Sequence, residues 1–166
     1  MDRSLSIETR EGLFTAFFSM RGLARLDFPG QGEAVTPAFH NSSALSPEQH
    51  RWRRMTTEAL RQPLAGRRPK ELPPLDWSGH TAFRQQVWQA LLELGPGETK
   101  TYAQIAAELG KPLAARATGG ACGANPIPVL VPCHRVLAAN GRLGGFSGGL
   151  DWKRRLLARE GVSAKN

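Results

Sequence analysis

Apolar and polar residues alternate over short runs near the start of the chain, and glycines beside charged residues separate the runs. The stretch LSIETREGLFTAFFSMRGLARLDF is interrupted at Gly12 and Gly22, which predicts a meander of three short strands. The sequence SPEQ at 46–49 offers a serine cap and a proline at the first helical position, and apolar residues follow it at helical spacing. We therefore expect a small sheet with one helix against a face of it.

The segment from Pro63 to Trp77 follows neither the strand period nor the helix period. It reads PLAGRRPKELPPLDW, with four prolines and a cluster of charge, and this composition is typical of a linker between domains. We therefore predict an amino-terminal α/β domain over 1–77, which includes a proline-rich linker at about 63–77, and a second domain over 78–166.

The second domain is predicted to be mostly helical. GHTAFRQQVWQALLELG carries an apolar stripe at helical spacing and ends at a Gly-Pro-Gly turn. TYAQIAAELGKPLAARATGGACGAN then predicts a helix that ends at Gly110, a tight turn, and a second helix that Pro112 opens. Small residues line this second helix, and Arg116 is the long side chain that stands out from them. LDWKRRLLAREG predicts a closing helix, whose basic run from Lys153 to Arg155 is expected on the solvated face.

Composition and charge indicate in which cellular compartment the protein works and which class of partner it binds. The 166 residues, 40% hydrophobic and 22% charged, indicate a globular protein with a core. No apolar run reaches the length that spans a membrane, and MDRSLSIETR contains no segment typical of an export signal, so we expect a cytoplasmic protein. In that reducing compartment Cys122 and Cys133 are expected to be free thiols. Lys and Arg outnumber Asp and Glu by 11 to 5 from Ser78 onward and by 11 to 9 before it, so the second half is the better candidate to face a polyanion.

Cysteine, histidine and arginine stand side by side in IPVLVPCHRVL, which begins at position 127. A thiol becomes a nucleophile as the thiolate, which needs positive charge, hydrogen-bond donors or a base nearby. Neighbouring residues on a regular element do not face one another, so His134 can serve Cys133 only through a bridging water or a tight turn after Pro132. Most buried cysteines are packing residues, so these residues alone leave catalysis and packing both open.

A histidine that acts as a base also needs a partner that holds its tautomer. The acidic residues after Cys133 are Asp151 and Glu160. Glu160 lies at the predicted end of the last helix, where the helix dipole disfavours a carboxylate unless other groups hold it.

A longer combination of motifs carries a family resemblance. NPIPVLVPCHRV, GGFSGG and LLAREG, preceded by TYAQIAAELGKPLAARATGGA, resemble the signature of the O6-alkylguanine-DNA alkyltransferases, the methylated-DNA–protein-cysteine methyltransferases. The resemblance runs from about Gly79 to Gly161, and residues 1–77 are similar only in outline. It implies an α/β (α+β) fold. A small ribonuclease H-like domain of sheet and helix would come first, and a mostly helical, winged helix-turn-helix-like domain would carry the active site.

The resemblance implies DNA repair by direct damage reversal in a single turnover. Cys133 would be the nucleophile and alkyl acceptor for O6-alkylguanine, with O4-alkylthymine as a second candidate lesion. His134 would be its water-mediated base, and Glu160 would orient His134. Asn125 would be a hinge between the recognition helix and the active-site loop, although an asparagine before a proline is also a common turn residue. The product is a thioether, which no ordinary step returns to a thiol, so each lesion would consume one protein molecule.

The resemblance also implies binding to double-stranded DNA that contains alkylated bases. The minor groove is narrow and suits a helix lined with small residues, and the target base would be flipped out of the duplex. The DNA-binding residues would be Arg116 as an intercalating finger, Tyr102 as a contact to base and phosphate, and Ala115, Thr118 and Gly119. The substrate pocket would be lined by Val136, Phe146, Ser147 and Gly148. We expect no cofactor and no membrane partner, and the protein would act as a monomer. We also expect no metal, because His40, His50 and His80 are scattered and the amino-terminal region has no cysteine, so the zinc site of some relatives cannot be built from Cys and His here.

Two other functions remain open. A non-catalytic DNA-binding lesion sensor or regulator would share the helix-turn-helix but would not need Cys133. A cysteine hydrolase would use a cysteine, a histidine and an acidic residue for acyl transfer, but it would leave the basic helix-turn-helix without a role.

Overall fold

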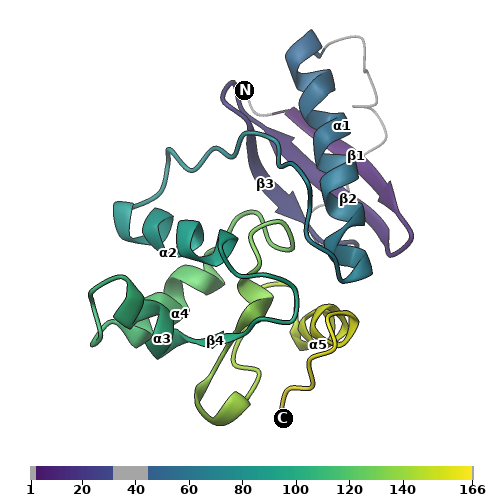
Figure 1. Cartoon of the computed structure of the whole chain (residues 1–166). Coiled ribbons are helices and arrows are strands. Elements are labelled where there is room, and N and C mark those ends of the chain that lie inside the picture. The colour runs from purple at the N-terminus through teal and green to yellow at the C-terminus, as the bar shows by residue number, and fades with distance from the viewer. Residues whose placement is uncertain (1–2, 32–44, 166) are drawn as a thin grey trace.

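A three-stranded antiparallel sheet begins the fold (Figure 1). In the computed structural model, which describes residues 3–31 and 45–165, β1 (Arg3–Thr9), β2 (Gly12–Phe18) and β3 (Leu23–Asp27) pair in the order β1-β2-β3. Gly12 opens β2 and Gly22 directly precedes β3, with φ of 114° and 154°, a backbone region that favours glycine. The predicted meander is therefore confirmed. Most of the polar loop that follows it lies outside the described residues.

The helix α1 (Pro47–Arg61) packs against this sheet, and the short turn η3 (Pro63–Ala65) follows it. Ser46 caps the helix as predicted, because its hydroxyl accepts a hydrogen bond from Gln49 N at 3.1 Å. The Gln49 side chain accepts a hydrogen bond from Ser46 N, also at 3.1 Å, which completes a capping box. Trp52, Ala59 and Leu60 are buried, so one face of α1 covers the sheet (Figure 1).

The proline-rich segment after η3 pairs in parallel with the first residue of β3, Leu23. Leu23 N donates to Pro74 O at 2.8 Å, and Asp76 N donates to Leu23 O at 2.9 Å. A single core cluster also joins residues of the sheet, such as Phe14, to residues of the second half, such as Trp88. The segment is therefore irregular, as predicted, but it is docked on the sheet. The boundary near residue 77 stays a prediction.

Three helices form the centre of the second half. α2 (Ala82–Leu92), α3 (Tyr102–Glu108) and α4 (Ala115–Gly123) contact one another, and threonine side chains cap α2 and α3. The prediction that Pro112 opens α4 is wrong. Ala114 N donates to Lys111 O at 2.9 Å, and this turn delays the start of the helix to Ala115.

Short elements connect α4 to the last helix. The turn η4 (Cys133–Arg135) leads into β5 (Val136–Leu137), which pairs in parallel with β4 (Lys100–Thr101). The turn η5 (Ala139–Gly141) follows, and α5 (Leu150–Arg159) closes the fold. The parallel pair holds Cys133 next to the start of α3, because α3 begins at Tyr102, directly after β4.

The class is mixed α/β, as predicted. The ribonuclease H-like and winged helix-turn-helix descriptions remain predictions. Among the described residues, every helix is too short or too polar to cross a membrane.

Candidate active site

The segment before Cys133 is folded back on itself around the side chain of Asn125. Asn125 Oδ1 accepts a hydrogen bond from Ile127 N at 3.0 Å, and its Nδ2 donates to Val131 O at 2.9 Å. Val129 has φ of 74°, a backbone conformation that costs a β-branched residue about 1–3 kcal/mol. The same Nδ2 lies 3.1 Å from Cys133 Sγ, to which it donates. Asn125 therefore holds both the turn and the thiol.

Cys133, His134 and Arg135 lie on the single 3-10 turn η4, directly after Pro132. Side chains on a 3-10 helix point about 120° apart, because it has about three residues per turn. The thiol of Cys133 meets Asn125 on one side, whereas His134 and Arg135 both reach Glu160. The structure contains a tight turn after Pro132, one of the two arrangements expected from the sequence, but this turn directs His134 to Glu160 and not to the thiol of Cys133.

Glu160 is the residue that joins the turn η4 to the end of α5. Its Oε1 lies 3.0 Å from His134 Nε2 and accepts a hydrogen bond from Arg135 Nη2 at 2.8 Å. Its Oε2 accepts from Gly97 N at 3.1 Å. These donors offset the unfavourable helix dipole at the carboxyl end of α5. The structure therefore brings together the histidine and the acidic residue that the sequence placed 26 positions apart.

The pKa values of this pair keep the histidine neutral and the glutamate charged. Burial lowers the pKa of His134, although the hydrogen bond to Glu160 opposes that effect. Burial alone would raise the pKa of Glu160, but the hydrogen bonds from His134 and Arg135 outweigh it and lower that pKa to about 2. A carboxylate only accepts hydrogen bonds, so the proton of the neutral imidazole lies on Nε2. The other nitrogen, Nδ1, is buried and has no hydrogen-bond partner within the described residues, so it is free to accept a proton.

The thiol of Cys133 is protonated at neutral pH. Burial raises its pKa to about 11, against the opposing effects of the Asn125 hydrogen bond and the charge of Lys153. Only 3% of Cys133 is exposed. A thiol in this state reacts slowly, so the site needs a base to activate the sulfur.

Tyr102, the first residue of α3, lies half-buried between α4 and the loop over 144–149. A Cβ atom at Gly144 would lie 2.7 Å from the Tyr102 hydroxyl, and one at Gly119 would lie 3.8 Å from the Tyr102 ring. Burial, with smaller contributions from the charges of Cys122 and Cys133, raises the pKa of Tyr102 to about 12. Its hydroxyl therefore keeps its proton and can donate a hydrogen bond next to the thiol.

The amino-terminal sheet supports the loop over 144–149 through Phe28. The Phe28 ring lies 5.7 Å from the Phe146 ring and 4.9 Å from the Trp152 ring. A Cβ atom at Gly148 would lie within 2.8 Å of Phe28 ring carbons, so Gly148 permits the close contact. Ser147 is exposed, and its carbonyl accepts a hydrogen bond from the side chain of Gln31 at 3.4 Å. Sequence patterns did not indicate this role of the amino-terminal half.

The carboxyl-terminal part of this chain matches a known family model. Residues 82–162 match the model described as "6-O-methylguanine DNA methyltransferase, DNA binding domain". A methylated-DNA–protein-cysteine methyltransferase of Salmonella typhimurium is 52% identical over 84 residues, which cover 51% of this chain and 49% of that protein. An inducible methyltransferase of that name from Bacillus subtilis is 46% identical over 101 residues, which cover 61% of this chain and 56% of that protein. The matched part is therefore about half the length of these curated relatives.

A solved structure extends the similarity to the whole chain. The crystal structure of Mycobacterium tuberculosis OGT in complex with DNA is 34% identical, with a TM-score of 0.75, over 95% of this chain and 92% of that chain. The chain belongs to the O6-methylguanine-DNA methyltransferase family. Cys133, His134 and Glu160 of this family member all lie within the part that matches the family model.

Lys153 is a further residue of the site in this family member, and the prediction from its sequence was wrong for this side chain. It was expected on a solvated face, but its side chain is fully buried. Its Nζ donates to the carbonyls of Val136 at 2.7 Å, Gly145 at 3.3 Å and Leu143. Burial lowers the pKa of Lys153 to about 8, against the opposing effects of the thiols of Cys133 and Cys122.

The spacing of apolar residues along α5 could have predicted that Lys153 is buried. Lys153 lies three and four residues before Leu156 and Leu157, which are also buried, so it belongs to the apolar face of α5. A lysine there needs acceptors, and the backbone carbonyls around the loop over 144–149 provide them. Lys153 therefore binds that loop to β5 and places a positive charge near Cys133.

The helix α4 of this methyltransferase-family chain exposes only part of the predicted DNA-binding set. Arg116 is exposed, and Ala115 and Gly119 are partly exposed. Thr118 is fully buried, so its side chain faces the interior and cannot reach a groove. Cys122 is also buried, as a packing residue would be, and burial raises its pKa to about 12.

Proposed function

We propose that this protein repairs alkylated DNA by direct reversal, with transfer of the alkyl group from O6-alkylguanine to Cys133. The observation that carries the proposal is the buried thiol, which Asn125 binds, next to a neutral histidine that Glu160 orients. This arrangement occurs in a chain that belongs to the O6-methylguanine-DNA methyltransferase family. O4-alkylthymine is the second candidate lesion.

The proton of Cys133 moves first, through a water, to Nδ1 of His134. Nδ1 is the nitrogen without a hydrogen-bond partner among the described residues, and Glu160 stabilises the imidazolium that forms. The sulfur then forms a bond to the alkyl carbon as the bond from that carbon to O6 breaks. The proton held on His134 Nδ1 then passes to the departing guanine anion, directly or through the same water, so neutral guanine and neutral His134 are restored and Cys133 becomes an S-alkylcysteine.

The reaction ends with the protein consumed. A thioether carries no acidic proton and is a poor leaving group, so no step regenerates the thiol. One chain therefore repairs one lesion.

The pair α3 and α4 acts as the helix-turn-helix that binds double-stranded DNA through the minor groove. The exposed surface of α4 is slim at Ala115 and Gly119, and Arg116 projects from it. A small-residue face suits a narrow groove, and a long side chain can occupy the space that a flipped base leaves. Tyr102 contacts the flipped base in this proposal, and its position against the backbone of Gly144 supports that role. We keep the predictions that the protein acts as a monomer in the cytoplasm and that its second half is a winged domain.

Intact-protein and peptide mass spectrometry after mixing with an equimolar duplex that contains one O6-methylguanine tests the proposal. We expect the peptide that holds Cys133 to gain one methylene, to a limit of one per chain, and the DNA to lose the lesion. Cys122→Ala is the matched control and should react fully, whereas Cys133→Ala should bind the duplex without a mass gain. An unmodified wild-type peptide beside an intact lesion would reject alkyl transfer and favour the lesion sensor.

The contacts of Cys133 argue against the other candidates. A lesion sensor needs no relay of His134 and Glu160 behind a thiol, yet both side chains are buried and paired. A cysteine hydrolase would release product from acyl esters, so the absence of release from such esters would exclude it.

A further inference from the structure

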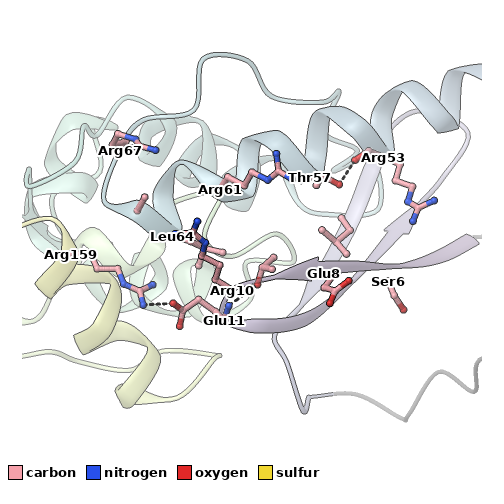
Figure 2. A pocket seen from close by; sticks show the side chains of 13 residues that line it. Ser6, Glu8, Arg10, Glu11, Arg53, Thr57, Arg61, Leu64, Arg67 and Arg159 are labelled. Atoms are coloured by element: carbon pink, nitrogen blue, oxygen red, sulfur yellow. Dashed lines mark hydrogen bonds and ion pairs between the residues drawn. The ribbon is translucent and has the colours of Figure 1, made fainter.

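A basic cleft lies between β1 and α1, on the side of the molecule away from α3 and α4 (Figure 1). Its volume is about 980 Å³, and Figure 2 shows the side chains that line it. They come from β1 and the turn after it, from α1, from η3 and the segment just after it, and from the end of α5. The charged residues among them are Glu8, Glu11, Arg10, Arg53, Arg61, Arg67 and Arg159.

The arginines exceed the glutamates in the cleft by five to two. Arg61 pairs with Glu58 and Arg67 donates to the side chain of Gln62, whereas two other arginines have no such partner in the part of the chain that the structure describes. Glu11 pairs with Arg159 and with Arg155 from outside the cleft. Within the described residues, Arg10 and Arg53 make no side-chain hydrogen bond or ion pair. The net charge of the first half hides this concentration, because most of its acidic residues, such as Asp27 and Asp76, do not line the cleft.

Arg159 adds a donor that lacks an acceptor. Its Nη2 donates to Glu11 at 2.5 Å, but its Nη1 is buried and has no hydrogen-bond partner among the described residues. Buried donors in folded proteins are nearly always paired. An acceptor held in the cleft would satisfy this nitrogen.

The basic surface continues along α1 beyond the cleft. A second hollow of about 540 Å³ shares Arg53, Thr57 and Arg61 with the first and adds His50, Arg54 and Glu58. The two hollows together form an elongated basic groove. Such a shape fits a chain of anionic groups better than a single small anion.

We propose that this groove binds phosphate groups, and that their source is the backbone of a nucleic-acid segment separate from the one at α4. Arginine is the side chain best suited to this ligand, because its planar fork donates two hydrogen bonds to one phosphate and stays charged. A free oligophosphate carries the same chemistry and is the second source that the experiment separates. The proposal does not depend on alkyl transfer by Cys133.

The first probe is inorganic tripolyphosphate, titrated by calorimetry into the full chain at low salt. Arg10→Ala with Arg53→Ala removes the two unpaired cleft charges, and Arg21→Ala with Arg51→Ala removes two exposed charges that line neither hollow. We expect the cleft variant to bind at least about tenfold more weakly than wild type, because charge-assisted contacts are lost. The control variant should bind as wild type does. Equal melting temperatures show that both variants fold.

The second probe is a short undamaged duplex, whose affinity is measured over a range of salt concentrations. If the DNA backbone occupies the groove, the slope of log affinity against log salt should fall by about 2 in the cleft variant, since each phosphate contact contributes about 0.9. It should stay unchanged in the control variant. A loss confined to tripolyphosphate would identify a free oligophosphate as the source. If neither probe separates the cleft variant from the control variant, the proposal is wrong.

Discussion

The ring nitrogen Nε2 of His134 lies 3.0 Å from Oε1 of Glu160, and neither side chain is exposed to solvent. The contact places the imidazole proton on Nε2 and leaves Nδ1 as an acceptor. The proposed activation of Cys133 depends on this orientation, because the thiol itself keeps its proton at neutral pH.

Glu160→Gln should slow alkyl transfer by about 10²–10⁴-fold, the usual contribution of a positioned base. The amide cannot stabilise the imidazolium, and it also leaves Arg135 buried without its anion, which costs about 3–5 kcal/mol of stability. Single-turnover kinetics with a lesion duplex measure the first effect. Glu58→Gln, on the exposed side of α1, should change neither quantity, and a wild-type rate in Glu160→Gln would exclude the relay.

The contribution of Glu160 to the free energy of unfolding should depend on pH. Its pKa falls from 4.5 to about 2 on folding, so the folded state favours the charged form. The contribution is complete above pH 4.5 and is lost as the pH falls toward 2. Urea unfolding of wild type and Glu160→Gln should therefore show a stability difference that is constant near neutral pH and narrows below about pH 4.5. A difference that does not change with pH would contradict the assignment.

Reaction of Cys133 with iodoacetamide should be slow at neutral pH and rise with pH toward the pKa of about 11. Asn125→Asp keeps an acceptor for Ile127 but replaces the donor to the sulfur with a negative charge. We expect it to raise the pKa of Cys133 further and to slow the reaction at pH 9. Peptide mass spectrometry follows each cysteine separately, so Cys122 is the internal reference. Equal rates in the two proteins would show that the Asn125 hydrogen bond has no effect on the thiol.

Lys153→Met should destabilise the fold by about 1–3 kcal/mol, because three backbone carbonyls lose their buried donor. It should also raise the pKa of Cys133, which the positive charge of Lys153 lowers, and so reduce alkyl transfer. Arg154→Ala, at the next and exposed position, is the matched control. An unchanged melting temperature and an unchanged rate of alkyl transfer in Lys153→Met would show that Lys153 has no role in the site.

Gly148→Ala should destabilise the protein, since its Cβ would overlap the ring of Phe28, and overpacking of this kind costs about 1–3 kcal/mol. In a Phe28→Ala background the same change should cost little, because the ring is absent. A double-mutant cycle by thermal unfolding measures this coupling. Additive effects would show that the two halves do not meet at this contact.

Local sequence determined much of the fold. Gly12 and Gly22 separate strands because glycine tolerates the turn conformations, and Ser46 caps α1 through atoms three residues away. These interactions are short-range, so they can be read from neighbouring residues. The identity of Cys133 and its neighbours also indicated the chemistry before any fold was known.

Tertiary structure alone decided which side chains meet. Lys153 is buried because carbonyls from β5 and the loop over 144–149 surround its nitrogen, and a sequence window around α5 does not contain those acceptors. Phe28 supports the loop from the other half of the chain, and Arg159 joins Arg10 and Arg53 in one cleft. Burial and charge are properties of the space around a group, and residues far apart in the sequence determine that space.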